Sequence, residues 1–166
     1  MRTGIALGSN LGDRLANLGD GRDLLLKLHE GTLPAAVSAV YETSPVGCPP
    51  GSPAFLNAVM EIETTLRPAE LLEKLAGCEQ RLGRAGGSAK NSPRPLDLDI
   101  LYAGDTRMAG EAITLPHPRL HLRRFVLQPL ADIRPELVLP GQTMTIAELL
   151  AELPDKSGVR LFASDW

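Results

Sequence analysis

The chain has 166 residues, of which 43% are hydrophobic, and a formal net charge of −3 from 17 basic and 20 acidic residues. This length favours one domain with a substantial core, so we expect residues 1–166 to form a single domain. The slightly acidic balance argues against a dedicated nucleic-acid-binding protein. We recognise no secretory signal, and no apolar run approaches the roughly 20 residues of a membrane span, so we expect a cytoplasmic protein that binds no membrane.

The first half of the chain alternates between strand and helix patterns. Residues 3–8 predict a short strand, and Asn10 or Asp13 can cap the helix that follows. Four leucines are expected on one side of that helix: Leu15, Leu18, Leu25 and Leu26. Residues 36–42 predict a second strand, which leads into a proline- and glycine-rich loop over residues 43–53.

The second half of the chain predicts a strand, a helix and another strand. Residues 55–62 alternate in polarity, which is typical of a strand with two different faces. A helix is expected to begin at Pro68 and to end before Gly83, with an apolar stripe of Leu71, Leu75, Cys78 and Leu82. The order β-α-β-β-α-β predicts an α+β, ferredoxin-like fold, in which both helices cover one face of an antiparallel sheet and loops roof an active site on the other.

Two aspartates in the last of these strands are the strongest chemical signal. Asp97 and Asp99 are expected on one face, about 6.5 to 7 Å apart at Cα, with Leu96, Leu98, Ile100 and Tyr102 on the other. Carboxylates this close repel unless a cation lies between them, and an all-oxygen ligand set favours Mg²⁺ or Mn²⁺. The alternative interpretation is an edge strand with a solvated polar face.

Cationic residues flank this pair in the sequence. Arg94 and His117 each lie between two prolines, which restrict the backbone on either side. His117 is followed by Arg119, Arg123 and Arg124, and then by Phe125. A polyphosphate joined to a flat heterocycle would use all of these groups. The alternative is that His117 caps a turn and that the arginines solvate the start of a helix.

Several motifs together resemble the 6-hydroxymethyl-7,8-dihydropterin pyrophosphokinase family of folate biosynthesis. They are Leu7-Gly8-Ser9-Asn10-Leu11-Gly12, Thr43-Ser44-Pro45-Val46-Gly47, Phe55-Leu56-Asn57-Ala58, Pro93-Arg94-Pro95-Leu96-Asp97-Leu98-Asp99-Ile100, Pro116-His117-Pro118 and Arg123-Arg124-Phe125. The motifs follow one another in the family's order over nearly the whole chain, and only the tail after Gly141 adds little.

The resemblance implies an enzyme that transfers pyrophosphate from ATP to the hydroxymethyl group of 6-hydroxymethyl-7,8-dihydropterin, giving AMP and the pterin diphosphate. It implies that Asp97 and Asp99 bind two Mg²⁺ ions, and that these aspartates form the catalytic set with Arg94, His117 and Arg123. It implies contacts to ATP from Arg84, Arg94, Ile100, His117 and Arg123. We expect these small molecules to be the partners of a monomer that binds no nucleic acid.

The same resemblance implies a pterin pocket. Phe55 and Phe125 would stack on the two sides of the pterin ring, and Asn57 would recognise its hydrogen-bonding edge. Thr43, Ser44 and Val46 would complete this pocket. Phe55 stands where some members of the family have tyrosine, which keeps the stacking and removes a hydroxyl group.

The chain departs from the family pattern between Arg84 and Ser92. Asn91 and Ser92 stand where the family usually has Trp-Gly, and Gly86 stands where an arginine is common. Arg84 and Lys90 are the basic residues left in this loop. Of the properties that the resemblance implies, closure of this loop over the nucleotide has the least support in the sequence.

Two other functions remain open at this point. One is a non-catalytic ferredoxin-like module that binds a nucleotide or another small ligand and regulates a partner. The other is a different Mg²⁺-dependent phosphotransferase that uses ATP. Formation of AMP that depends on Mg²⁺ and on hydroxymethyldihydropterin would distinguish the pyrophosphokinase from both.

Overall fold

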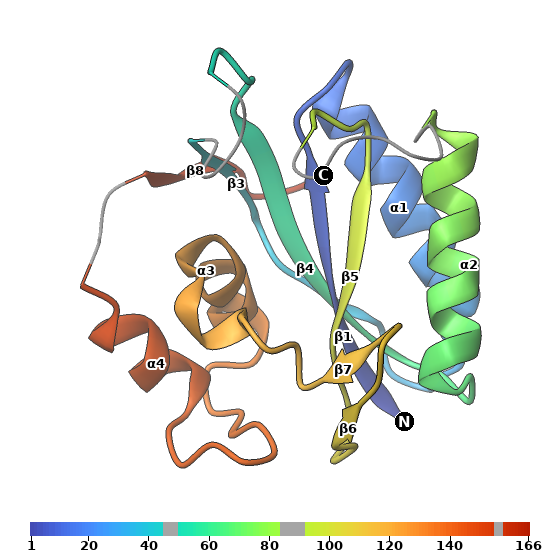
Figure 1. Ribbon diagram of the computed structural model, residues 1–166, viewed down its shortest axis with the longest axis vertical. Helices are drawn as coiled ribbons and strands as arrows, with labels where there is room; N and C mark the ends of the chain where they lie inside the picture. The colour runs from blue at the N-terminus through green and yellow to red at the C-terminus, as the bar shows by residue number, and fades with distance from the viewer. Residues whose placement is uncertain (45–49, 84–91, 155–157) are drawn as a thin grey trace.

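The central element is an antiparallel sheet whose strand order matches the ferredoxin-like arrangement (Figure 1). The computed structural model describes residues 1–44, 50–83, 92–154 and 158–166. The sheet order is β5-β1-β4-β3-β8, and the short β2 also pairs with β4. The strands are β1 (Arg2–Ser9), β2 (Ala36–Val37), β3 (Val40–Thr43), β4 (Phe55–Glu63), β5 (Asp97–Ala103) and β8 (Val159–Ala163). The predicted fold class is therefore confirmed, with the expected second strand divided into β2 and β3.

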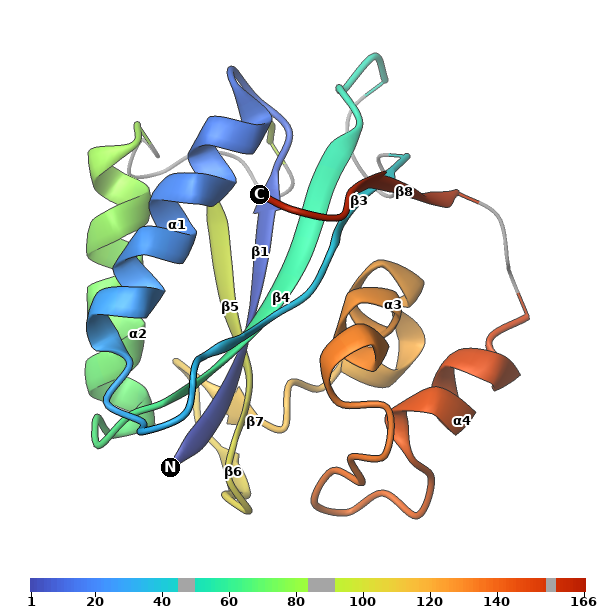
Figure 2. The same cartoon turned by 180° about the vertical axis from the view of Figure 1, so that it is seen from behind.

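Helices α1 (Arg14–Leu28) and α2 (Pro68–Arg81) cover one face of this sheet, as Figures 1 and 2 show from opposite sides. Helix α2 begins at Pro68, buries Leu71, Leu75 and Cys78, and is followed by Gly83 at a φ of 99°. A positive φ favours glycine, so the sequence signals for both ends of α2 were correct.

Helix α1 packs differently from the prediction. Its N-cap is Asp13, whose side chain accepts a hydrogen bond from the Ala16 N–H at 3.1 Å. Leu18 and Leu25 are buried, whereas Leu15 and Leu26 are 37% and 46% exposed, so these two core assignments are wrong. Gly21 of the same helix is also buried. A Cβ at this position would lie 3.1 Å from Leu7 Cδ2. The glycine thus allows a close approach of the helix to the sheet.

Helix α3 (Arg124–Ile133) packs on the second face of the sheet, and α4 (Ile146–Glu152) packs against α3 (Figure 1). They bury a separate hydrophobic cluster that includes Val59 of β4 with Val126, Leu127 and Leu130 of α3. Loops alone would leave these apolar side chains in water, which explains why the face is not roofed by loops throughout. The end of the sheet where β1 stops and β4 and β5 begin remains open beside the start of α3.

Strand β5 interrupts its own alternation. Ile100 pairs with Ile5 and Tyr102 pairs with Gly4, so Leu101 is an extra residue opposite β1. Leu98 and Ile100 face α1 and α2 as expected, but Tyr102 lies in the cluster on the α3 face. The predicted orientation of Tyr102 is therefore wrong, because one inserted residue reverses the side-chain pattern that follows it.

The remaining described elements are short. Strands β6 (Met108–Ala109) and β7 (Thr114–Leu115) form a two-stranded ribbon, and a 3₁₀ turn at Leu120–Leu122 precedes α3. Among the described helices, none combines the length and apolar character that crossing a bilayer requires.

Candidate active site

A cavity of about 120 Å³ opens on the α3 side of the sheet, at the upper end in Figure 1. It is lined by residues from β1, β3, β4 and β5, by the segment before β5, and by the start of α3. The predicted site residues in its lining are Thr43, Ser44, Phe55, Asn57, Arg94, Asp97, Asp99, His117, Arg123 and Phe125. Segments far apart in the sequence thus bring carboxylates, cations, an amide and two aromatic rings to one cavity.

The other three predicted site residues are Val46, Arg84 and Ile100. Val46 and Arg84 lie outside the described residues, as does most of the unusual segment between Arg84 and Ser92. Ile100 is buried on the α1 and α2 side of the sheet, with Leu98 and Ile5.

Arg94 provides a cation next to the aspartate pair. Its Nη1 donates to Asp97 Oδ1 at 3.0 Å, and both side chains are mostly buried. The Nε of Arg94 is buried and has no hydrogen-bond partner within the described part of the chain. Since an unsatisfied buried N–H is costly, this atom is suited to an anionic ligand oxygen.

Buried Asn10 fixes the backbone of Arg94. The Asn10 Oδ1 accepts the Arg94 N–H at 2.8 Å, and the Asn10 N–H donates to the Arg94 carbonyl oxygen at 3.2 Å. The Asn10 amide nitrogen lies 3.5 Å from the carbonyl oxygen of Pro53, in the loop before β4. Asn10 therefore connects the two segments that enclose the cavity.

We expect Asn10→Ala to lower the free energy of unfolding by about 1 to 3 kcal/mol, the cost of leaving buried polar groups unpaired. The ATP contact that the family resemblance implies for Arg94 should also weaken, since Arg94 loses its backbone support. Denaturant unfolding and calorimetric titration with a non-hydrolysable ATP analogue measure both effects. Asn17→Ala is a suitable control, because Asn17 uses its amide on the exposed carbonyl of Leu11. Equal effects of the two substitutions would contradict a specific role for Asn10.

His117 and Arg123 form another wall of the cavity. Burial, with the guanidinium groups of Arg123 and Arg119, lowers the pKa of His117, so the ring is neutral at physiological pH. Its Nδ1 accepts the Arg119 N–H at 3.2 Å, which leaves the hydrogen on Nε2. Burial also lowers the pKa of Arg123, although an arginine stays charged near neutrality. This wall thus presents a neutral N–H donor and a cation.

The other part of the cavity suits a flat polar ring. Buried Asn57 donates from Nδ2 to Thr43 Oγ1 at 2.8 Å, so the orientation of its amide is fixed. A Cβ at Gly8 would lie 3.2 Å from Asn57 Oδ1 and 3.8 Å from Phe55 Cδ1, so glycine keeps the floor of the cavity open. The Arg123 guanidinium carbon lies 5.5 Å from the centroid of Phe125, within cation–π range.

The donor set of the cavity fits magnesium. Asp97 and Asp99 offer carboxylate oxygens on one face of β5, as predicted. Within the described ranges no group of three or more acidic, histidine or cysteine side chains is placed to hold a metal. Mg²⁺ commonly uses one or two carboxylates and takes its other ligands from water and substrate phosphate, so two aspartates suffice.

A second cavity, of about 230 Å³, adjoins the first, since Asp99 and His117 line both. Its other walls come from α2, from β5 and from the chain around β7, through Leu72, Ile100, Ile113 and Thr114. Sequence reasoning selected only Ile100 from this group. Leu72, Ile113 and Thr114 carry no distinctive chemistry, and only the folded chain brings them together.

The sequence matches the family model of 7,8-dihydro-6-hydroxymethylpterin-pyrophosphokinase (HPPK) over residues 4–135. The chain belongs to the HPPK family. It is 40% identical over 158 residues to the 2-amino-4-hydroxy-6-hydroxymethyldihydropteridine pyrophosphokinase of Bacillus subtilis, which covers 95% of this chain and 88% of the relative. The enzyme of the same name from Haemophilus influenzae is 37% identical over 157 residues, or 95% of this chain and 96% of the relative.

Other HPPK relatives are much longer. The folic acid synthesis protein fol1 of Schizosaccharomyces pombe is 38% identical over 160 residues, or 96% of this chain and 21% of that protein. This chain therefore spans about a fifth of the length of that relative. The crystal structure of wild-type Plasmodium falciparum HPPK-DHPS superposes with a TM-score of 0.68 at 13% identity, over 91% of this chain and 44% of that one. This similarity confirms that the chain has the fold of an HPPK domain.

Proposed function

We propose that this HPPK-family chain catalyses Mg²⁺-dependent transfer of a diphosphoryl group from ATP to 6-hydroxymethyl-7,8-dihydropterin. The observation that carries the proposal is the single cavity that joins an aspartate pair and cationic side chains to an aromatic and amide pocket. The hydroxymethyl oxygen would attack the β-phosphorus of ATP and lose its proton. The bond from that phosphorus to the α,β-bridging oxygen would break, and AMP would leave.

The residues near Asp97 and Asp99 are proposed to hold the triphosphate. Bound Mg²⁺ would neutralise charge on the phosphate oxygens during transfer. Arg94 and Arg123 would contribute fixed positive charge, and His117 would donate from Nε2 to a phosphate oxygen. Because these groups are held before the substrate arrives, they require little reorganisation when charge develops in the transition state.

The pterin is proposed to lie between Phe55 and Phe125, with Asn57 facing its hydrogen-bonding edge. The Arg123 guanidinium lies beside Phe125, so this residue would border both the ring and the phosphates. Thr43, Ser44 and Val46 would close the pocket. Ring stacking and an oriented amide together discriminate a pterin from a simple aromatic ligand.

The adenine base is proposed to enter the second cavity. Its lining is apolar at Leu72, Ile100 and Ile113, and it borders the first cavity at Asp99 and His117. This position would let one nucleotide extend from an apolar pocket to the metal ligands. Arg84 would add a further contact to ATP from the segment that follows α2.

Product analysis tests the proposed reaction. Purified protein with ATP, Mg²⁺ and hydroxymethyldihydropterin should form AMP and pterin diphosphate in equal amounts, and omission of Mg²⁺ or pterin should stop AMP formation. ADP as the nucleotide product would favour a different phosphotransferase. The absence of turnover with retained ATP binding would favour the non-catalytic binding module.

A further inference from the structure

The bulge of β5 links a buried polar contact to the active site. Leu101 is the extra residue between the pairs Ile5–Ile100 and Gly4–Tyr102, and both Leu101 and Tyr102 face α3. Bulges are common next to active sites, where an inserted residue changes the direction in which a strand presents its groups. The two residues of this bulge make different contacts. Leu101 lines the active-site cavity, whereas Tyr102 bonds to Glu61 outside it.

Leu101 connects the bulge to His117. Its side chain lines the active-site cavity, and its carbonyl oxygen accepts the His117 N–H at 2.8 Å. His117 lies between Pro116 and Pro118, neither of which has an N–H to donate. The Leu101 carbonyl is therefore the backbone acceptor that fixes this segment against β5, and a shift of the bulge would move His117.

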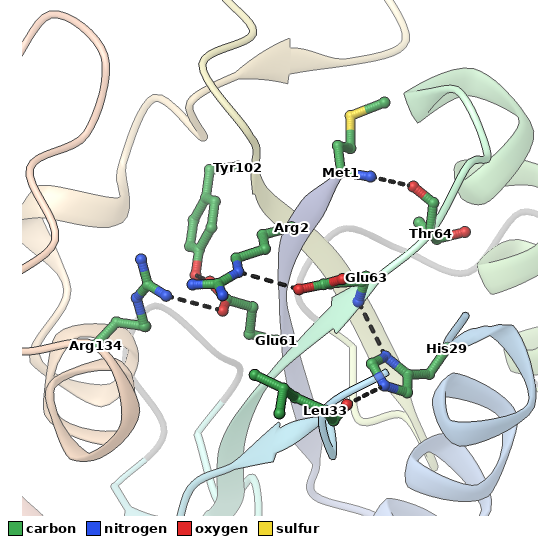
Figure 3. Close-up of polar contacts among 9 residues, drawn as sticks. All are labelled: Met1, Arg2, His29, Leu33, Glu61, Glu63, Thr64, Tyr102 and Arg134. Carbon is green, nitrogen blue, oxygen red and sulfur yellow. Dashed lines mark hydrogen bonds and ion pairs between the residues drawn. The ribbon is translucent and has the colours of Figure 1, made fainter. Parts of the chain in front are cut away.

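Tyr102 is held on this same face of the sheet by Glu61 of β4 (Figure 3). The Tyr102 hydroxyl donates to Glu61 Oε2 at 2.6 Å, and Arg134 Nη1 donates to Glu61 Oε1 at 3.2 Å. Glu61 is only 7% exposed, so both of its oxygens are used within the protein. Burial and the Glu61 carboxylate raise the pKa of Tyr102 well above its ordinary value, so the hydroxyl remains a donor.

Gly4 provides the space for this arrangement. A Cβ at Gly4 would overlap the Tyr102 ring, so the ring lies directly against the β1 backbone. If β5 alternated regularly through Leu101, Tyr102 would face α1 and α2 and could not reach Glu61. The ring position and the charged hydrogen bond thus both require the bulged register.

We propose that Tyr102 and Glu61 are positioning residues, which hold the β5 bulge in the register that presents the Leu101 carbonyl to His117. The inference rests on the proposed function, in which His117 contacts ATP. It explains what holds His117 in the orientation that this contact needs. Neither Tyr102 nor Glu61 lines the active-site cavity, so both would act only through the bulge.

A second tyrosine–carboxylate contact in the same protein supplies a matched control. The Tyr41 hydroxyl lies 3.0 Å from each carboxylate oxygen of Asp132, which ties β3 to α3. This contact uses the same chemistry on the same face of the sheet, but among the described residues no hydrogen bond joins it to His117 or to Leu101. Loss of a tyrosine hydroxyl can therefore be compared at two places, one of which supports the bulge.

The test compares Tyr102→Phe with Tyr41→Phe. Tyr102→Phe should speed hydrogen exchange of the His117 backbone N–H about tenfold in the ligand-free protein, because the bond to Leu101 opens more often. It should lower kcat about tenfold and change either KM less than twofold, since a misplaced catalytic group affects chemistry more than binding. Tyr41→Phe should leave the His117 exchange rate and kcat within about twofold of wild type.

A conservative variant separates positioning from packing. Glu61→Gln keeps both contacts, because its amide oxygen can accept from Arg134 and its amide nitrogen can donate to the Tyr102 hydroxyl oxygen. Glu61→Gln should therefore resemble wild type in His117 exchange, whereas Glu61→Ala should resemble Tyr102→Phe. An unchanged His117 exchange rate in Tyr102→Phe would overturn the inference, as would equal effects of the two Tyr→Phe variants. Failure of the proposed function would appear separately, as absence of AMP formation by the wild type.

Discussion

Asp99→Asn is expected to lower turnover by a factor on the order of 10³, the usual loss when a preorganised electrostatic group is removed. Asn keeps the size of the side chain, so the cavity should retain its shape. The substitution also relieves repulsion from Asp97, so the free energy of unfolding should stay level or rise slightly. Steady-state kinetics and chemical denaturation, measured on the same preparation, test this combination of a lost activity and an intact fold.

Asp97→Asn should lose activity to a similar extent but differ in stability. Its carboxylate pairs with Arg94 at 3.0 Å, and the two side chains are 25% and 21% exposed. Loss of this partly exposed ion pair should cost up to about 1 kcal/mol of unfolding free energy. Mn²⁺ binding followed by electron paramagnetic resonance in the presence of a non-hydrolysable ATP analogue should weaken in both variants. Mn²⁺ affinity and turnover near wild type in either variant would contradict the metal assignment.

Asn57→Ala is expected to weaken pterin binding by about 1 to 3 kcal/mol, or roughly 5- to 150-fold, because polar atoms of the bound ring would be left unpaired. Binding of the ATP analogue should change little, since Asn57 lies in the part of the cavity that is proposed to hold the pterin. Calorimetric titration with each ligand separately measures both affinities.

Thr43→Val provides a graded comparison for Asn57. Valine keeps the shape of threonine but cannot accept the Asn57 Nδ2–H bond, which is 2.8 Å long in the structure. The amide would remain present but less firmly oriented, so pterin affinity should fall by less than in Asn57→Ala. Equal losses of ATP and pterin affinity in Asn57→Ala would indicate a structural role for this residue instead.

The sequence was most informative where short-range rules apply. The start of α2 at Pro68 and the glycine after its end follow from local backbone preferences. The shared face of Asp97 and Asp99 follows from the two-residue period of a strand. The motifs shared with the HPPK family then indicated residues from distant segments, and ten of these positions line one cavity in the structure.

The errors arose where packing overrides local pattern. The alternation in β5 gives no sign of the extra residue Leu101, so the orientation of Tyr102 was predicted incorrectly. Gly21 offers no apolar side chain that would mark it as a core position, yet the absence of a side chain there lets α1 approach Leu7. Both features depend on how two elements meet, which the sequence of either element alone does not specify.

The tail after Gly141 carried little signal but contributes to the architecture. It forms α4 and then β8, which pairs with β3 at the edge of the sheet. The four-stranded ferredoxin-like core was complete without β8, so the motif order gave no reason to expect another strand. Likewise, the second cavity depends on Leu72 and Ile113, ordinary apolar residues whose proximity results from the fold.

The most direct test of the account is a single-turnover experiment with ATP labelled at the γ-phosphorus, in which enzyme exceeds ATP and hydroxymethyldihydropterin saturates. We predict that the label reaches the pterin at the same rate as AMP appears, in a ratio of one to one, and that Asp99→Asn shows neither product on this timescale. Appearance of ADP before AMP, or release of the label as free pyrophosphate while the pterin stays unmodified, would contradict transfer of an intact diphosphoryl group at this site.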